Sequence, residues 1–382
     1  LGGSGSKDAS DGVKSIGLSF VQMISLLNTF PISWPAVFIS LFQIGEAVTV
    51  LGQHLVNLKC MFPERSEAEV FYSSQIVWAM VPIGLSGACA ATWCLVDCVV
   101  NSASVCTSRS KNKGVEETQP QLKEKDIMAT DDAEEEGEGA AEKLPEAVPQ
   151  QQRQKVRLAL RQKISASVVA LLYLVWPGLC SETFSLFACR SFCGETARLR
   201  LNIDLHEICF QGRHANFALL LGVPVLVLYV IGLPIGALIM VWRLRRRAKR
   251  NGMSVHECKG HLTWGLFYSA FREETWWWEG TVALRKIGIA TIGLFGIAME
   301  EMQVSLTLLL VSLVILLTAQ LRPYGENSTG KLLLRLELST LCMLYLTLWA
   351  AGVFTVYPRC EIGVGESVLW CEMMSVTIGL AN

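Results

Sequence analysis

Long apolar runs, separated by short polar segments, recur along most of the chain. The clearest run, 217–242, ends abruptly at a dense group of basic residues in 243–250. An α-helix needs about 20 apolar residues to cross a bilayer, and this run exceeds that length. A further run, 367–380, indicates a partial eighth span or a short re-entrant piece. The pattern as a whole predicts seven full spans, at 36–58, 75–100, 165–187, 217–242, 280–299, 304–321 and 332–357.

Two segments at the beginning of the chain do not fit a span. Residues 1–14 are rich in Gly, Ser and Asp, and we expect a flexible linker there. Residues 15–30 are moderately apolar but contain several serines, Gln22 and Asn28. This second segment is too short and too polar to cross a membrane on its own, which favours a helix that lies at the membrane interface.

Residues 107–152 interrupt the apolar pattern. Between Glu116 and Glu146 twelve acidic residues stand against three lysines, with no apolar period, so we expect a disordered, acidic, cytosolic insert. In the next segment, Arg153, Arg157 and Arg161 recur every four residues beside an apolar stripe. That pattern is typical of a surface helix at anionic headgroups, and it fits equally well a helix that simply continues out of the membrane.

Composition also indicates a membrane protein. Of the 382 residues, 51% are hydrophobic and only 18% are charged, whereas soluble globular proteins average roughly 25% charged residues. We therefore predict an all-α fold, a polytopic bundle of transmembrane helices with a disordered insert. Because the first eleven residues contain no apolar signal segment, we expect this chain to be a piece of a longer protein. The predicted parts are 1–14, 15–106, 107–152 and 153–382.

The distribution of basic residues predicts which compartment each loop faces. With the N-terminus inside, the segments next to the spans hold nineteen Lys and Arg residues on the cytosolic side and seven outside. This asymmetry follows the positive-inside rule. We expect an integral protein, of the plasma membrane, with a cytosolic N-terminus and an unused glycosylation sequon at Asn327.

The cysteines of the loops agree with this orientation, because most of them fall on the outer side, where disulfides form. We predict a disulfide between Cys189 and Cys209, since this pair closes a loop that must fold back between two adjacent helix ends. A zinc site is the alternative, and its ligands would be Cys189, Cys193, His206 and Cys209. We expect no cofactor and no metal.

Several residues are typical of a membrane interface. Trp276, Trp277 and Trp278 precede the fifth span, and Trp prefers the headgroup region. We expect two basic segments to bind anionic lipids of the cytosolic leaflet: 153–163, which begins at Arg153 and ends at Lys163, and 243–250. The anchors expected in the second segment are Arg243, Arg245, Arg246 and Arg247.

The sequence contains no HExxH, no P-loop and no GxSxG motif, so we do not expect an enzyme. Ionisable groups within spans are better functional candidates. Glu46 lies in the middle of the first predicted span, where it would face an ion path or make a structural hydrogen bond. Gly363, Gly365 and Glu366 have the residue types of a tight, acidic selectivity element, and an ordinary Gly-rich turn fits them equally well.

Three more ionisable residues, Glu279, Arg285 and Lys286, lie at the start of the fifth predicted span. An ion pair at the interface, or cations that reach toward lipid phosphates, would explain them without a function. No span carries Arg at every third position, so the sequence gives no support for a voltage sensor.

Short motifs spread along the chain occur together in one family. They include Phe20-Val21-Gln22, Trp34-Pro35, Leu186-Phe187-Ala188-Cys189, Ile231-Gly232-Leu233-Pro234, Trp277-Trp278-Glu279 and Arg322-Pro323-Tyr324. This set resembles the multi-pass C-terminal membrane module of very large algal and protist surface proteins, a module similar to transient-receptor-potential (TRP) and polycystin-type channels. The resemblance covers about 15–357, and it implies an upstream ectodomain with one further span.

The resemblance favours a TRP-like cation channel that couples an outer ectodomain to the cytosol and is compatible with a homo-oligomer. The alternative is a non-conducting surface receptor or adhesion anchor. A secondary transporter would show internal repeats with discontinuous helices, and the sequence shows no convincing repeat. We expect the lipid bilayer as a partner and no nucleic acid.

Overall fold

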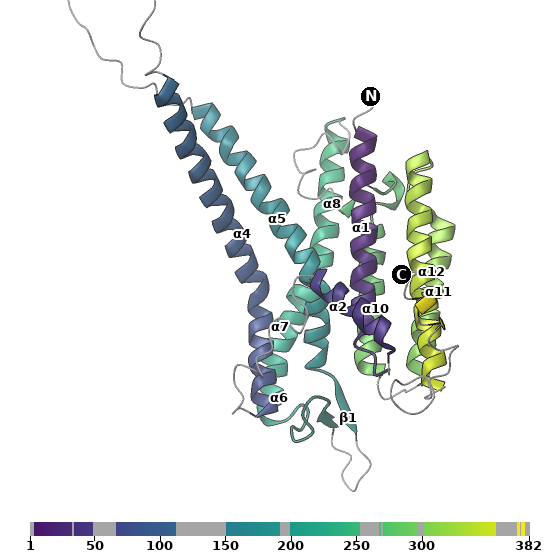
Figure 1. Cartoon of the computed structure of the whole chain (residues 1–382). Helices are drawn as coiled ribbons and strands as arrows, with labels where there is room; N and C mark the ends of the chain where they lie inside the picture. Colours follow the sequence, from purple (N-terminus) through teal and green to yellow (C-terminus); the bar gives the residue numbers. More distant parts are fainter. Residues whose placement is uncertain are drawn as a thin grey trace, which may run out of the picture. The chain divides into compact units, whose positions relative to one another are not determined.

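The computed structural model is built almost entirely of helices (Figure 1). It divides into two compact units, Leu1–Ser86 with Ser165–Asn382 and Gly87–Ile164, which are described separately below. The all-α class predicted from the sequence is confirmed. The residues that the structure describes are 4–32, 34–48, 66–111, 150–191, 199–252, 267–268, 270–296, 301–356, 373–374 and 376–378.

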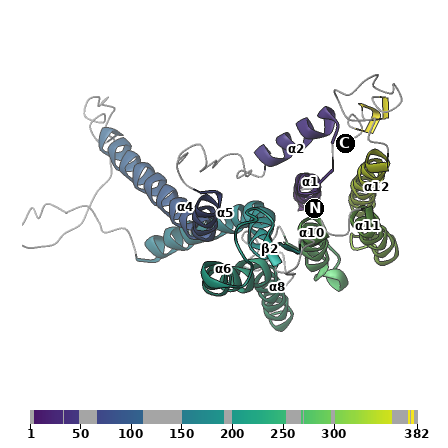
Figure 2. The same cartoon turned by 90° about the horizontal axis from the view of Figure 1, so that it is seen from below.

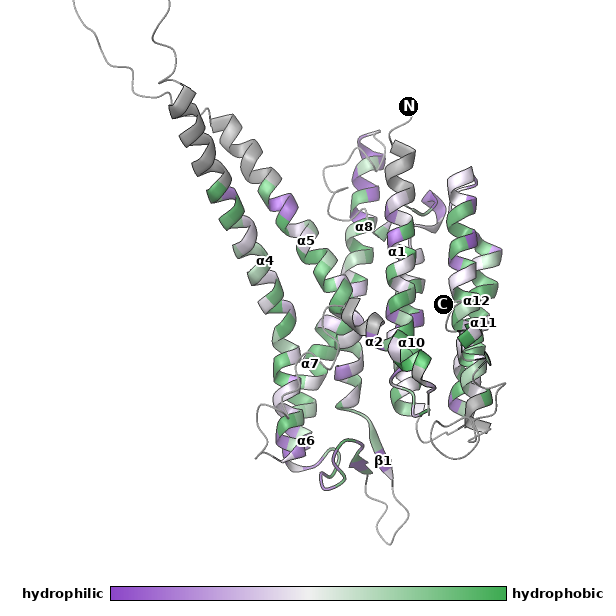
Figure 3. Cartoon of the chain, viewed as in Figure 1, coloured by the Kyte–Doolittle hydropathy of each residue, from purple (hydrophilic) through white to green (hydrophobic). Residues whose placement is uncertain are grey.

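Five of the helices in the described part of the chain are long and apolar enough to cross a membrane. They match the predicted spans at 75–100, 165–187, 217–242, 304–321 and 332–357. Figure 3 shows their predominantly apolar residues, with polar residues more frequent toward the helix ends and connecting segments. The helices that contain them are α4 (Glu67–Lys111), α5 (Gln150–Ser185), the continuous run from α6 (Gly212–Phe217) to α8 (Gly232–Arg250), α11 (Glu301–Leu321) and α12 (Ser328–Val356).

The large unit has two ends that differ in chemistry. At one end α8 finishes in the basic segment 243–250, where the Arg245 guanidinium lies 5.8 Å from the centre of the Trp276 ring. At the other end α5 leads into a small sheet of β1 (Cys189–Ser191) and β2 (Leu199–Leu201), antiparallel, with Cys189 opposite Leu201. We call these the basic end and the disulfide end.

Helix α1 (Ser4–Leu27) departs from the prediction in two ways. It begins at Ser4, within the segment expected to be a flexible linker, and it packs inside the bundle instead of lying at an interface. Figure 2, viewed along the helices, shows α1 beside α10 (Trp278–Phe295), and α1 also contacts α12. Met23 and Leu27 are fully buried there. The apolar side of α1 therefore covers other helices and is not left for headgroups.

The contacts of α1 also give its direction. Ile16 packs against Tyr324 and Leu333 near the basic end, while Phe30, just after the helix, approaches Gly293 near the disulfide end. Helix α4 begins at that same disulfide end, where Tyr72 stacks on Phe217 at 4.3 Å between ring centres. The chain thus passes from the basic end to the disulfide end along α1.

The two remaining predicted spans are only partly described. Helix α2 (Ala36–Val48) covers 13 residues of the run 36–58, and the rest of that run lies outside the described residues. Helix α10 covers most of 280–299 but carries three charged side chains, which reduce its apolar character. Of the partial eighth span, the structure describes only helical residues at 373–374 and 376–378.

Two prolines each remove a backbone hydrogen bond from their own helix. In both cases a side chain of another helix donates to the carbonyl that is left free. Pro177 in α5 cannot donate to the carbonyl of Tyr173, and the side-chain amide of Gln22 donates to that oxygen at 3.0 Å. Pro234 in α8 follows a π-helical segment, η2 (Leu226–Ile231). The Trp176 indole donates to the carbonyls of Tyr229 at 3.2 Å and Val230 at 3.3 Å. These contacts favour fixed joints over hinges.

The small unit contains the end of α4 and the beginning of α5. Within it, the Lys163 ammonium lies 5.4 Å from the centre of the Trp93 ring. Helix α5 is continuous from Gln150 to Ser185, so the basic segment 153–163 extends the helix of the third predicted span. Of the two interpretations of that segment, the structure supports the continued helix, and lipid binding there stays a prediction. Most of the acidic insert, 112–149, lies outside the described residues.

The direction of α1 can be tested with cysteine variants at two exposed positions, Lys14 within the helix and Asn28 just after it. In sealed vesicles, a membrane-impermeant maleimide should label Lys14→Cys from the same side as Lys249→Cys in the basic segment. It should label Asn28→Cys from the opposite side. The unaltered protein sets the background from native cysteines. An interfacial α1 would instead expose Lys14→Cys and Asn28→Cys on one side only.

Candidate functional site: a buried charged cluster

Four ionisable side chains lie buried inside the bundle where α1, α5, α10 and α12 meet. Glu279, Arg285 and Lys286 come from α10 and Glu337 from α12, and each is at most 7% exposed. An isolated charge in a membrane core is costly, so buried charges of this kind are normally paired. The cluster contains two acids and two bases, and its formal charges cancel.

Arg285 and Glu337 form the first half of the cluster. The Arg285 guanidinium makes a direct ion pair with the Glu337 carboxylate and donates a second hydrogen bond to Ser19 Oγ of α1 at 3.0 Å. The Tyr324 hydroxyl donates to the other Glu337 oxygen at 3.4 Å. Burial, and then the negative charge of Glu337, raise the pKa of Tyr324, so this hydroxyl keeps its proton and remains a donor.

Lys286 forms the second half. Its ammonium donates to Gln22 Oε1 at 2.7 Å and to the Tyr173 hydroxyl at 3.2 Å, and it lies 4.6 Å from the centre of the Tyr173 ring. The same Gln22 donates through its amide nitrogen to the Tyr173 carbonyl, which Pro177 leaves free. Glu279 is a side-chain hydrogen-bonding neighbour of Tyr173. The Tyr173 hydroxyl therefore lies between the Lys286 ammonium and the Glu279 carboxylate.

This arrangement explains the buried polar residues of α1. Ser19 and Gln22 are three residues apart, so they share one face of the helix. Each binds one of the two adjacent cations of α10. A polar group buried with a charged partner stabilises instead of costing free energy. The cluster thus links four helices, α1, α5, α10 and α12, through polar contacts.

The predicted ion-path residues cannot be placed at this cluster. Glu46 belongs to α2, but its side chain is outside the described residues. Gly363, Gly365 and Glu366 also lie outside the described residues. A role for these four residues in an ion path stays a prediction.

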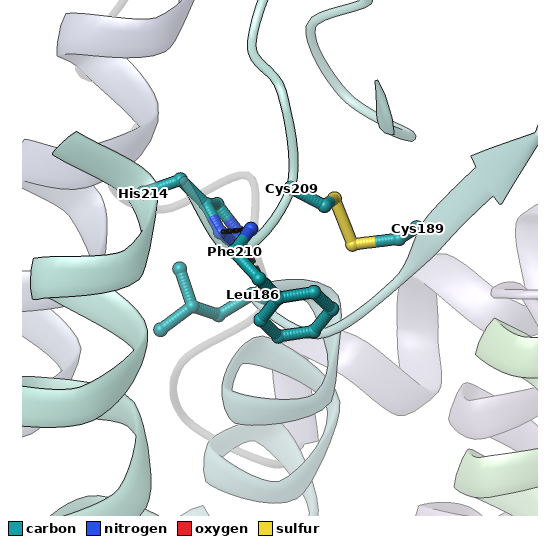
Figure 4. The surroundings of a disulfide bond; sticks show 5 residues. All are labelled: Leu186, Cys189, Cys209, Phe210 and His214. Atoms are coloured by element: carbon teal, nitrogen blue, oxygen red, sulfur yellow. Dashed lines mark hydrogen bonds between the residues drawn. A yellow bond between two sulfur atoms is a disulfide. The ribbon is translucent and has the colours of Figure 1, made fainter. Parts of the chain in front are cut away.

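The disulfide predicted between Cys189 and Cys209 is present (Figure 4). These sulfurs and one His214 nitrogen lie within 4.8 Å of one another, but the sulfurs are bonded together. Both ring nitrogens of His214 are occupied: Phe210 N–H donates to Nδ1 at 2.9 Å, and Nε2 lies 3.0 Å from the Leu186 carbonyl. Because the cysteines form a disulfide, the zinc alternative does not hold for this state.

The other two residues of the suggested zinc set are His206 and Cys193. His206 is exposed and bonds Asp204 at 3.2 Å. Cys193 lies outside the described residues. The backbone N–H of His206 donates to the Asp204 carboxylate and lowers the pKa of Asp204, which fixes this turn of the loop.

The expected interface anchors separate into two groups. Trp278 is 1% exposed and packs within the protein, so its side chain cannot reach headgroups. Trp277 is exposed and Trp276 is partly exposed. In α8 the Arg246 guanidinium lies 3.8 Å from the centre of the Trp242 ring, next to Arg243, Arg245 and Arg247. The anchor prediction is therefore corrected for Trp278. For the other residues the anchor role stays a prediction.

No family model matches the chain, and neither a curated protein nor a solved structure shows significant similarity to it. The family suggested by the short motifs therefore stays a prediction.

Removing one partner of the buried ion pair should be more harmful than removing both. Glu337→Gln leaves the Arg285 charge without its counter-ion and should lower the free energy of unfolding by about 3 kcal/mol. The double variant Arg285→Met with Glu337→Leu should recover most of that loss. Denaturant unfolding of the purified protein in detergent measures both changes.

The exposed Glu326 provides a matched control, because Glu326→Gln makes the same chemical change away from the cluster. It should alter stability by less than about 0.5 kcal/mol. Equal losses for Glu337→Gln and Glu326→Gln, or a double variant at least as unstable as Glu337→Gln, would contradict a buried ion pair.

Proposed function

We propose that this chain is the membrane domain of a TRP-like cation channel that couples an outer ectodomain to the cytosol. The observation that carries the proposal is the buried charged cluster formed by Glu279, Arg285, Lys286 and Glu337. Ionisable residues are rare inside membrane helices and generally mark ion pathways, relays or the elements that move in them. A bundle that served only as an anchor could be built from apolar side chains.

The proposed orientation puts the basic end in the cytosol and the disulfide end outside, at the plasma membrane. Two features support it. The segment 243–250 is strongly basic, as cytosolic segments are, and the Cys189–Cys209 disulfide suits an oxidising compartment. Both features belong to the large unit and lie at its opposite ends.

At the basic end, the proposal includes anionic lipids as partners. Arg243, Arg246 and Lys249 are exposed in the last turns of α8, and Trp277 is exposed next to Trp276, whose ring lies 5.8 Å from the Arg245 guanidinium. Arginine stacked on an indole, as Arg246 is on Trp242, suits the boundary between acyl chains and headgroups. The proposal also includes a homo-oligomer, in which several copies of the chain surround one conducting path.

The alternative, a non-conducting receptor or adhesion anchor, is favoured by one specific observation. Most charged groups of the cluster have partners inside the protein: Glu337 pairs with Arg285, and Lys286 donates hydrogen bonds to Gln22 and Tyr173. Such a cluster of internal contacts can hold helices together without moving ions.

Conduction decides between the two functions. When the purified chain is reconstituted in liposomes, the cation flux reported by a cation-sensitive fluorescent dye should exceed the flux in empty liposomes. Glu366→Gln should abolish the flux, because it removes a carboxylate from the candidate selectivity element. Glu361→Gln is the matched control in the same polar segment and should leave the flux unchanged.

Absence of flux from folded protein, tested under membrane stretch, voltage and calcium, would favour the anchor. Flux that both variants reduce equally would remove Glu366 from the ion path while leaving the channel itself in place.

A further inference from the structure

A cavity of about 230 Å³ lies next to the charged cluster, between α5, α8 and α10. Its walls are mostly apolar, with Trp176 and Leu172 from α5 and Leu233, Gly236 and Val241 from the fourth span. Glu279, Lys286 and Tyr173 supply its polar lining. Apolar walls with a few convergent polar groups are typical of small-molecule sites.

The polar groups of the cavity define what could bind there. Lys286 has three N–H donors and, among the described residues, two hydrogen-bond acceptors, Gln22 and Tyr173. Glu279 is an acceptor, and the cluster already carries two positive and two negative charges. A charged ligand would add a net charge to the membrane core, which is costly. The matching group is therefore neutral and both donates and accepts, as a hydroxyl does.

The volume indicates the size of the part of a ligand that fits inside the cavity. A water molecule takes up about 30 Å³ of liquid, so the cavity has room for a compact apolar body of roughly eight such volumes. We propose that this cavity binds a neutral amphiphile, a medium-chain alcohol, whose hydroxyl contacts the polar lining formed by Glu279, Lys286 and Tyr173 and whose apolar part packs on Trp176 and Val241. The proposal does not depend on ion conduction.

Gly236 offers a way to close the cavity without breaking the fold. It lines the cavity, and a Cβ built on it meets no atom within 4 Å. Gly236→Leu should therefore fill the site with a side chain. Gly84 in α4 is also free of neighbours within 4 Å and does not line the cavity, so Gly84→Leu makes the same change at a control position.

The test uses the full chain in lipid nanodiscs with a diazirine derivative of octanol as photolabel. After irradiation, peptide mapping by mass spectrometry should find the adduct on α8 or α10 residues that line the cavity, and excess octanol should compete. Gly236→Leu should reduce this labelling at least about tenfold, through loss of space and of the hydroxyl contacts. Gly84→Leu should leave it unchanged.

Two results would overturn the proposal. Labelling that is the same in Gly236→Leu and in the unaltered protein would place the probe elsewhere. Equal, competable labelling by a diazirine octane without a hydroxyl would show that lipid-like packing alone fills the cavity. Thermal unfolding and the Cys189–Cys209 disulfide, measured on each variant, establish that reduced labelling does not come from misfolding.

Discussion

The hydrogen bond from Lys286 to Gln22 is the contact on which the arrangement of the bundle depends. Gln22 accepts from the Lys286 ammonium of α10 and donates to the Tyr173 carbonyl of α5, which Pro177 leaves without its helical donor. One side chain of α1 thus supplies hydrogen bonds to two other helices, α10 and α5. Losing it would leave a buried cation and a buried carbonyl short of partners, and such groups are costly in a membrane core.

This constraint connects the structure to both candidate functions. The cluster holds α1, α5, α10 and α12 together, and Glu279 and Lys286 also line the neighbouring cavity. A molecule in that cavity would therefore touch the same side chains that fix α1 in place. In a channel, such contacts could bias the position of a helix. In a receptor, they would couple a ligand to the bundle without any ion path.

The sequence predicted the spans whose apolar runs are uninterrupted, and it also predicted the disulfide, because one loop between helix ends brings Cys189 and Cys209 together. It failed for α1 because a pattern of polar positions cannot reveal partners more than 260 residues away, as the Gln22–Lys286 contact is. Glu337 went unnoticed as the partner of Arg285 for the same reason. The charge count of the last three predicted spans did not reveal it either, because these spans contain three bases, Arg285, Lys286 and Arg335, and one acid, Glu337.

A double-mutant cycle on Gln22 and Lys286 tests the account most directly. The free energy of unfolding is measured in detergent for Gln22→Leu, Lys286→Met, the double variant and the unaltered protein. If the two side chains bond inside the bundle, their coupling energy should be about 1 kcal/mol or more. Additive effects, with a coupling energy below about 0.5 kcal/mol, would contradict a bundle in which α1 is held by the buried charges of α10.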